Sequence, residues 1–186
     1  MIIDLIRHTT PAIDLGICYG QTDLDLKESF QSEFDAIHEK IDLDYDIVIS
    51  SPLQRCLKLA KTLQKASPEI DPRIMEYNFG DWELRPWSEF KTKTAKQWMD
   101  NFVDQPAPNG DSMISMRERV LSFWEDLIAQ NHSRVAVVTH SGVQRLLHAE
   151  ILETPLNRMF RLELDFGAII RISHNKESKL TTIKHL

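Results

Sequence analysis

The sequence predicts a three-layer α/β/α fold, in which helices cover both faces of a mostly parallel central sheet with an antiparallel edge. Short apolar segments, such as residues 2–6 and 134–139, alternate with segments of helical periodicity, a pattern typical of parallel sheets. The final apolar segments, 160–164, 168–173 and 180–183, follow one another closely along the chain. They therefore predict two or three antiparallel strands at one edge.

The first half of the chain contains two predicted strands, each followed by a helix. Residues 2–6 (IIDLI) are short and mostly apolar, which indicates a buried strand. A helix is predicted over 27–41, where phenylalanine and isoleucine recur every three or four positions. The apolar segment 46–49 predicts the second strand. Helical periodicity returns over 53–65, with Ser51 as the expected N-cap.

The second half contains the clearest buried strand of the sequence. Residues 70–86 are irregular and rich in proline, glycine and acidic residues, and a helix is predicted over 87–103. A long amphipathic helix follows over 112–130. Residues 134–139 (RVAVVT) then form an apolar run, as expected for a strand that is buried on both faces. The next helix is predicted over 143–152.

Composition and charge narrow the classes of function. A length of 186 residues suggests a single domain over 1–186. The net charge of −6 argues against a nucleic-acid partner, because such binding depends on neutralising many phosphates. No apolar run approaches the ~18 residues of a membrane span, and no signal peptide is evident, so we expect a cytoplasmic protein without a membrane partner. Cys18 and Cys56 lack metal-type spacing, so no metal site is expected.

Polar side chains follow three of the predicted strands at the point where each strand ends. Arg7 and His8 follow the first strand, residues 50–55 follow the second, and residues 140–142 follow the third. Sites in parallel sheets form beyond the carboxyl ends of the strands, so we expect these groups to converge. Arginine presents a planar fork of donors that matches phosphate oxygens, and a neutral imidazole can attack phosphorus. The sequence therefore favours phosphoryl chemistry.

Phosphate ester cleavage also needs an acid that protonates the leaving oxygen. The segment MEYNFGDWE supplies Glu76 in a loop rich in aromatic residues, where partial loss of solvent raises the pKa of a carboxyl group. Glu83, in the same loop, is the alternative acid.

Four motifs in this order resemble the histidine phosphatase superfamily, in the branch that includes phosphoglycerate mutases and fructose-2,6-bisphosphatase. Arg7-His8 stands at the family's R-H-G position, and SSPLQRC is similar to its S-x-L-x-R motif. EYNFG resembles the family's E-x-x-x-G segment, and THSG resembles the motif of its second histidine. The four motifs extend over nearly the whole chain.

This resemblance implies a role for each residue. His8 is the nucleophile that becomes phosphohistidine, while Arg7, Arg55 and His140 bind the phosphoryl oxygens and stabilise charge in the transition state. Glu76 protonates the leaving group and then activates the water that hydrolyses the intermediate. No cofactor or metal is implied, and the expected partner is a small-molecule phosphomonoester.

The loop after His8 departs from the family's pattern. Thr9 and Thr10 stand where the family usually has glycine and often glutamate, and the position where it often has asparagine holds Asp14, or Ile13 if the loop is one residue shorter. Thr9 either crowds the phosphate or adds a donor to it, and Thr10 or Gln21 are further candidate donors. We expect Thr9, Gln21 and Ser141 to contact the substrate.

Within the family, the segments GQTDLDL, NFGDWELR and PNGDS are most similar to the alpha-ribazole phosphatases. This similarity implies alpha-ribazole 5′-phosphate as the substrate, in the assembly of the cobalamin nucleotide loop. Trp82 or Trp87 would stack on its base, and the remaining aromatic residues of this region would form a hydrophobic cap. The acidic loops 14–28 and 76–89 are expected to repel a substrate with a second anionic group. Another small phosphomonoester, a mutase-like reaction, or phosphate binding without catalysis remain the alternatives.

Overall fold

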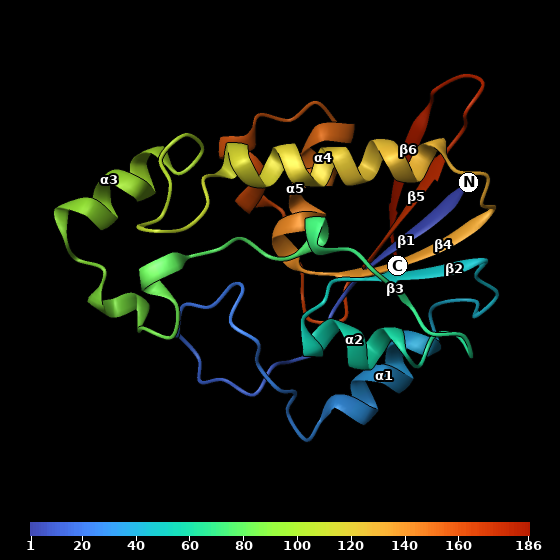
Figure 1. The fold of residues 1–186 in the computed structure, drawn as a ribbon, viewed down its shortest axis with the longest axis horizontal. Helices are drawn as coiled ribbons and strands as arrows, with labels where there is room; N and C mark the ends of the chain where they lie inside the picture. The colour runs from blue at the N-terminus through green and yellow to red at the C-terminus, as the bar shows by residue number, and fades with distance from the viewer.

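A sheet of six strands, in the order β3-β2-β4-β1-β5-β6, forms the centre of the computed structural model, which describes residues 1–186 (Figure 1). The first four strands in this order are parallel, whereas β5 and β6 run antiparallel to their neighbours. The predicted fold class is therefore confirmed. The strands are β1 (Ile2–Arg7), β2 (Ile47–Ser50), β3 (Glu69–Ile70), β4 (Arg134–Thr139), β5 (Ile169–His174) and β6 (Thr181–His185).

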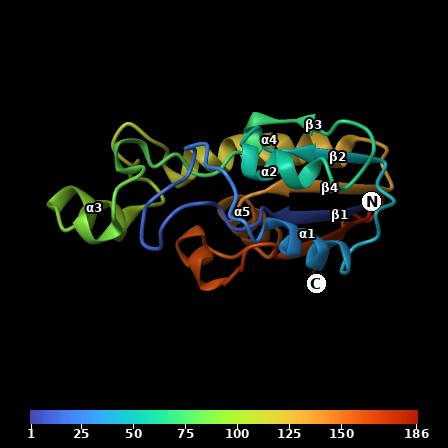
Figure 2. The same ribbon diagram turned by 90° about the horizontal axis from the view of Figure 1, so that it is seen from below.

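Helices cover both faces of the sheet (Figures 1 and 2). On one face lie α1 (Phe30–His38) and α2 (Gln54–Ala60), and on the other lie α4 (Met113–Ala129) and α5 (Ser141–Ile151). The helix α3 (Lys93–Asn101) projects away from the sheet, beyond the carboxyl ends of its parallel strands. None of these helices combines the length and the apolar character needed to cross a membrane.

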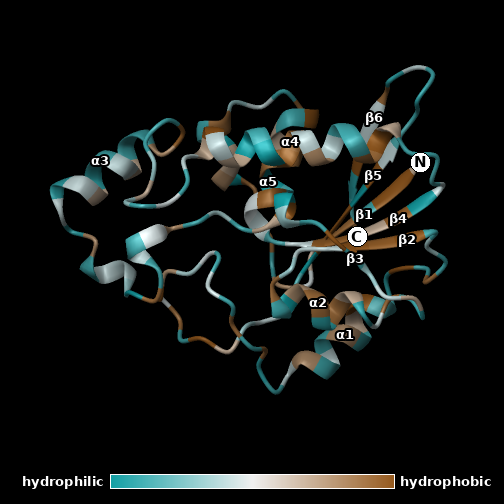
Figure 3. Cartoon of the chain, in the orientation of Figure 1, coloured by the Kyte–Doolittle hydropathy of each residue, from teal (hydrophilic) through white to brown (hydrophobic).

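The central strands β1, β2 and β4 are strongly apolar (Figure 3), as expected for strands buried on both faces, whereas the edge strands β3 and β6 are largely exposed. Along β4, Val135 and Val137 belong to a core cluster of 26 residues on the side of α4 and α5. Ala136 and Val138 point the other way, into a cluster of 13 residues that includes the buried faces of α1 and α2. The alternation follows from the two-residue period of a strand.

Several predicted elements differ in extent or type. The helices expected over 27–41, 53–65 and 87–103 are shorter, and the last of these begins only after Thr92, whose side chain caps it. Of the two or three strands expected in the last part of the chain, two form, β5 and β6, and no strand forms over 160–164, where the 3-10 helix Leu156–Arg161 ends.

The 3-10 helix has a physical explanation in its burial pattern. Met159 is buried, whereas its neighbour Phe160 is 52% exposed, so only one side of the turn enters the core. The segment follows Pro155 and packs against α5, where the Arg145 side chain donates a hydrogen bond to the carbonyl of Leu162. The segment thus packs on α5 rather than beside a strand of the sheet, so its backbone has no strand with which to pair.

Candidate active site

The polar groups that follow β1, β2 and β4 meet at one edge of the sheet, because these three strands are parallel neighbours. His8 follows β1, Arg55 lies in the first turn of α2 after β2, and His140 follows β4. All three side chains are buried, and Arg55 and His140 are inaccessible to solvent. The centroids of the two imidazole rings are 5.1 Å apart.

The imidazole of His8 is arranged as a nucleophile. Its Nδ1 lies 2.7 Å from the carbonyl oxygen of Thr9, which requires the proton to be on Nδ1 and leaves a lone pair on Nε2. Burial and the neighbouring Arg55 hold the pKa of His8 well below its ordinary value. The ring is therefore neutral at physiological pH.

The guanidinium of Arg55 is fixed by acceptors from several segments. Its Nε lies 3.3 Å from Nε2 of His8, and its Nη1 donates to the carbonyl of Thr22 at 2.8 Å. Its Nη2 donates to the carbonyl of Gly20 and lies 3.4 Å from Nδ1 of His140. None of these partners is negatively charged. The positive charge of the buried guanidinium is therefore not neutralised by its neighbours, and it can interact with an anion bound beside Nε2 of His8.

Ser51 is a component of the site that the sequence interpretation missed. We expected it to cap α2, but the cap residue is Leu53, which makes no side-chain capping bond. The Ser51 Oγ instead lies 2.8 Å from Nε2 of His140 and so orients that ring. Burial, followed by the charge of Arg55, holds the pKa of His140 well below its ordinary value.

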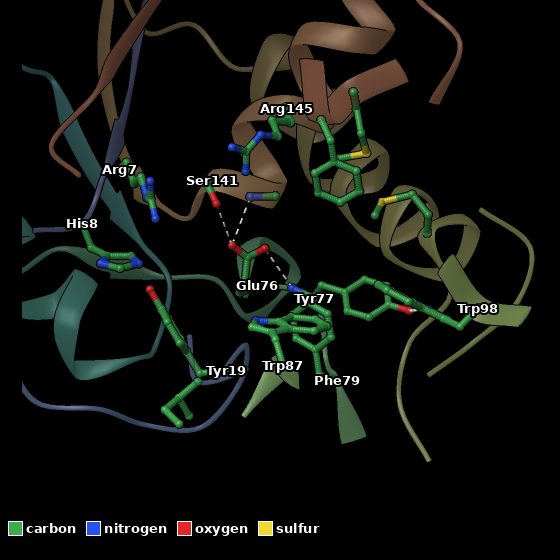
Figure 4. A pocket seen from close by; sticks show the side chains of 15 residues that line it. Arg7, His8, Tyr19, Glu76, Tyr77, Phe79, Trp87, Trp98, Ser141 and Arg145 are labelled. Carbon is green, nitrogen blue, oxygen red and sulfur yellow. Dashed lines mark hydrogen bonds between the residues drawn. The ribbon is translucent and has the colours of Figure 1, made fainter. Parts of the chain in front are cut away.

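The carboxylate of Glu76 binds the amino-terminal end of α5 (Figure 4). One oxygen, Oε2, accepts hydrogen bonds from the Gly142 amide at 3.0 Å and from the Ser141 hydroxyl at 3.4 Å. The other, Oε1, accepts one from the Tyr77 amide at 3.0 Å. A Cβ atom on Gly142 would lie 2.1 Å from Oε1, so the residue at this position has to be glycine for the carboxylate to sit there. Ser141 thus positions Glu76 in this structure.

Glu83, the alternative acid, is engaged as a backbone anchor. Its carboxylate accepts hydrogen bonds from the amides of Gln21 (2.8 Å), Thr22 (2.6 Å) and Phe79 (3.2 Å) and from the Thr22 hydroxyl. Burial raises the pKa of Glu83, but these hydrogen bonds outweigh it, and the net effect lowers the pKa. Of the two carboxylates, only that of Glu76 lines the cavity beside His8, which favours Glu76 as the acid.

We expected Thr9, Thr10 and Gln21 to donate hydrogen bonds to the substrate. In the structure, these three side chains lie in other environments. Thr10 donates from its amide and its hydroxyl to Glu33. Gln21 donates its side-chain amide to the carbonyl of Glu76 at 3.0 Å. Thr9 is inaccessible to solvent, and its hydroxyl has no hydrogen-bond partner and lies outside the cavity wall.

A cavity of about 220 Å³ opens beside His8 and Glu76. Arg7 lines it, with its guanidinium 4.0 Å from the ring centroid of Phe166 and one nitrogen bound to the carbonyl of Leu164. Burial lowers the pKa of Arg7 from its ordinary value. Six aromatic side chains share the lining, namely Tyr19, Tyr77, Phe79, Trp87, Trp98 and Phe160.

Only one of the two tryptophans expected to stack on a base reaches this cavity. Trp87 is 37% exposed and forms part of the wall (Figure 4). Trp82 is 5% exposed and packs in the cap, with its ring centroid 5.2 Å from those of Phe90 and Trp98. Trp82 is thus part of the hydrophobic cap.

Arg145 is a second missed component, and it brings a third arginine to the site. It points into the cavity from α5, one helical turn beyond Ser141 (Figure 4). Its Nε donates to the carbonyl of Leu162 at 2.9 Å, while the guanidinium lies 5.7 Å from the Phe160 ring centroid. The four-residue spacing from Ser141 was the available signal. This cation weakens the expectation that acidic loops exclude a second anionic group.

The chain matches a known family and known structures along almost its whole length. The model of the histidine phosphatase superfamily (branch 1) matches residues 3–184. The protein named "Putative phosphoserine phosphatase 2" of Hydrogenobacter thermophilus is 28% identical over 187 residues, which cover 96% of this chain and 92% of the relative. The adenosylcobalamin/alpha-ribazole phosphatase of Escherichia coli is 27% identical over 192 residues, with coverage of 98% and 93%.

Structural similarity extends equally far. The crystal structure of the alpha-ribazole phosphatase from Shigella flexneri superposes with a TM-score of 0.88 at 26% identity. The superposition covers 100% of this chain and 96% of that one. Because the family model spans nearly the full sequence that carries the four motifs, the chain belongs to the histidine phosphatase superfamily, branch 1.

Proposed function

We propose that this protein is a metal-independent phosphomonoesterase that acts through a phosphohistidine at His8. The observation that supports this most is the neutral, buried imidazole whose Nε2 faces the guanidinium of Arg55. A neutral imidazole attacks phosphorus with the Nε2 lone pair that accepts the Arg55 hydrogen bond in this structure, and the fixed cation beside it stabilises the charge that develops on the phosphoryl oxygens.

The reaction has two steps. Nε2 of His8 forms a bond to phosphorus while the bond to the leaving oxygen breaks, and protonated Glu76 gives its proton to that oxygen. Glu76, now a carboxylate, then takes a proton from a water molecule that attacks phosphorus and releases His8. Arg7, Arg55 and His140 hold the phosphoryl group throughout both steps.

Two variants with a labelled phosphomonoester test this mechanism. Brief exposure is expected to give an acid-labile, base-stable phosphoprotein, with turnover unaffected by a chelator. His8→Ala is expected to abolish both the label and turnover, whereas His148→Ala, on the far part of α5, is expected to retain them. Near wild-type turnover in His8→Ala would overturn the mechanism, and strong loss in EDTA would indicate a metallophosphatase.

For the substrate, we propose alpha-ribazole 5′-phosphate, hydrolysed in the cytoplasm. Support comes from the segments similar to alpha-ribazole phosphatases and from the relatives that carry this name. The aromatic wall, with Trp87 partly exposed on it, offers a surface on which a benzimidazole can stack. A panel of phosphomonoesters, compared by kcat/KM, tests this choice against 3-phosphoglycerate and fructose 2,6-bisphosphate. If either matches the nucleotide, the substrate proposal fails while the phosphohistidine mechanism remains.

Arg145 favours a second candidate, a small phosphomonoester that also carries a carboxylate, such as phosphoserine. No hydrogen bond engages the two terminal nitrogens of its guanidinium, which are the groups that pair with carboxylates. One relative bears the name of a phosphoserine phosphatase.

The test of this second candidate compares phosphoserine with phosphoethanolamine, which lacks the carboxylate. Arg145→Met is expected to reduce kcat/KM for phosphoserine about 10- to 100-fold more than for phosphoethanolamine. Arg117→Met is the matched control, because Arg117 pairs with Glu150 outside the cavity. Equal losses on both substrates in Arg145→Met would remove this candidate.

A further inference from the structure

The phosphoryl group needs hydrogen-bond donors that the loop after His8 does not supply. Thr10 is bound to Glu33 and Gln21 is bound to the carbonyl of Glu76, while Thr9, like Arg55 and His140, is inaccessible to solvent and does not line the cavity. A group in transfer carries negative charge on three oxygens, and each donor aimed at that charge lowers the barrier. The cavity wall contains a further donor that the mechanism has not used.

Tyr19 is this donor. Its side chain lines the cavity together with Arg7, His8 and Glu76. Its hydroxyl points toward His8 and Arg7 (Figure 4), while the guanidinium of Arg55 lies 5.6 Å from its ring centroid. The phenol therefore faces the cavity that Arg7, His8 and Glu76 line.

The backbone on both sides of Tyr19 is fixed. On one side, the Cys18 amide donates to the carbonyl of Arg85, and the Cys18 carbonyl accepts from the amide of Leu84, both at 2.8 Å. On the other side, the Gly20 carbonyl accepts from Arg55. A Cβ on Gly20 would lie only 1.8 Å from the carbonyl oxygen of Tyr77, so the chain passes there in close contact. Donors held in this way need no reorganisation during the reaction.

We propose that the Tyr19 hydroxyl donates a hydrogen bond to a non-bridging phosphoryl oxygen during transfer to and from His8. The inference rests on the proposed phosphohistidine mechanism and names a further catalytic residue for it. The hydroxyl keeps its proton throughout, since Glu76 supplies the only proton that moves to the leaving oxygen. Burial raises the pKa of Tyr19, although Arg7 and Arg55 act in the opposite direction, so the phenol remains a donor at neutral pH.

Tyr19→Phe removes only the hydroxyl and keeps the ring that packs in the wall. It is expected to lower kcat about 100-fold, the effect typical of losing one donor to a developing oxyanion. Because the contact is to the phosphoryl group, the loss is expected to be the same for p-nitrophenyl phosphate and for a phosphate with an alkyl leaving group. The affinity for vanadate, a transition-state analogue, is expected to fall more than that for inorganic phosphate.

Tyr45→Phe is the matched control, because the Tyr45 hydroxyl is bound to Asp4 in the sheet, away from the cavity. It is expected to retain kcat and vanadate affinity, with any effect confined to the melting temperature. The inference is overturned if Tyr19→Phe keeps wild-type kcat, if its loss occurs with only one class of leaving group, or if both variants lose activity in proportion to stability. Turnover that persists in His8→Ala would instead refute the proposed mechanism, whatever Tyr19→Phe does.

Discussion

Gly142→Ala is expected to separate the catalytic role of Glu76 from the stability of the fold. The new Cβ would lie 2.1 Å from Oε1 of Glu76 and 3.2 Å from Cε of Met116. The closer atom is at the end of a flexible side chain, so the carboxylate moves while α5 keeps its place. The hydrogen bond from the Gly142 amide to Oε2, 3.0 Å long, is then lost or distorted.

The expected magnitude differs between catalysis and stability. A positioned general acid contributes about 10²–10⁴-fold, so displacing Glu76 is expected to cost at least about 100-fold with an alkyl leaving group. The cost is expected to be below about 10-fold with p-nitrophenyl phosphate, whose phenolate leaves without much protonation. Alanine is favoured over glycine by about 1 kcal/mol in a helix interior, but Gly142 is the second residue of α5, so the gain in melting temperature is expected to stay below roughly 2–4 °C. The lost hydrogen bond offsets part of that gain.

The assay measures kcat/KM for both kinds of substrate, together with thermal unfolding. Glu76→Gln serves as the reference. The double variant Gly142→Ala/Glu76→Gln is expected to lose no more kcat/KM than Glu76→Gln alone, because both substitutions remove the same function, proton donation by Glu76. Ser141→Ala, which removes only the 3.4 Å hydrogen bond, is expected to have a smaller effect. Equal losses on both leaving groups in Gly142→Ala, or full activity with the alkyl ester, would refute the assignment of Glu76 as the acid.

Three other outcomes are expected. Because burial lowers the pKa of His8 and His140 in the folded chain, only the unfolded chain takes up these protons below about pH 6.5. Urea unfolding should therefore show stability that falls from pH 6.5 toward pH 5, and a free energy of unfolding that is constant over this interval would contradict the burial argument. Trp87→Ala should raise KM for alpha-ribazole 5′-phosphate about 10-fold, with little change for glycerol phosphate, if the ring contributes its usual stacking energy of roughly 1–3 kcal/mol; parallel changes on both esters would exclude stacking. Glu83→Gln should destabilise the fold by about 1–3 kcal/mol in thermal unfolding and lower activity equally for good and poor leaving groups, in contrast to Glu76→Gln.

The sequence alone determined the architecture and the convergence of the buried polar groups. Two-residue and 3.6-residue periodicities are local properties, so they placed the strands that became β1, β2 and β4 within a residue or two. Since the carboxyl ends of parallel strands share one edge, the positions of His8, Arg55 and His140 followed from those strands.

Only the tertiary structure decided the parts of the site that depend on distant partners. Glu76 and Glu83 share one loop, and what distinguishes them is which donors reach each carboxylate, from α5 in one case and largely from residues 21–22 in the other. Ser51 had the pattern of a helix cap until the His140 ring, 89 residues away, was placed beside it. Arg145 had the pattern of an ordinary helical arginine, because nothing in its own segment shows that α5 faces a cavity. Hydrogen bonds between segments far apart in the chain, and the burial of one segment by another, produce no periodic pattern in the sequence. These contacts exist only once the chain has folded, so only the tertiary structure identifies them.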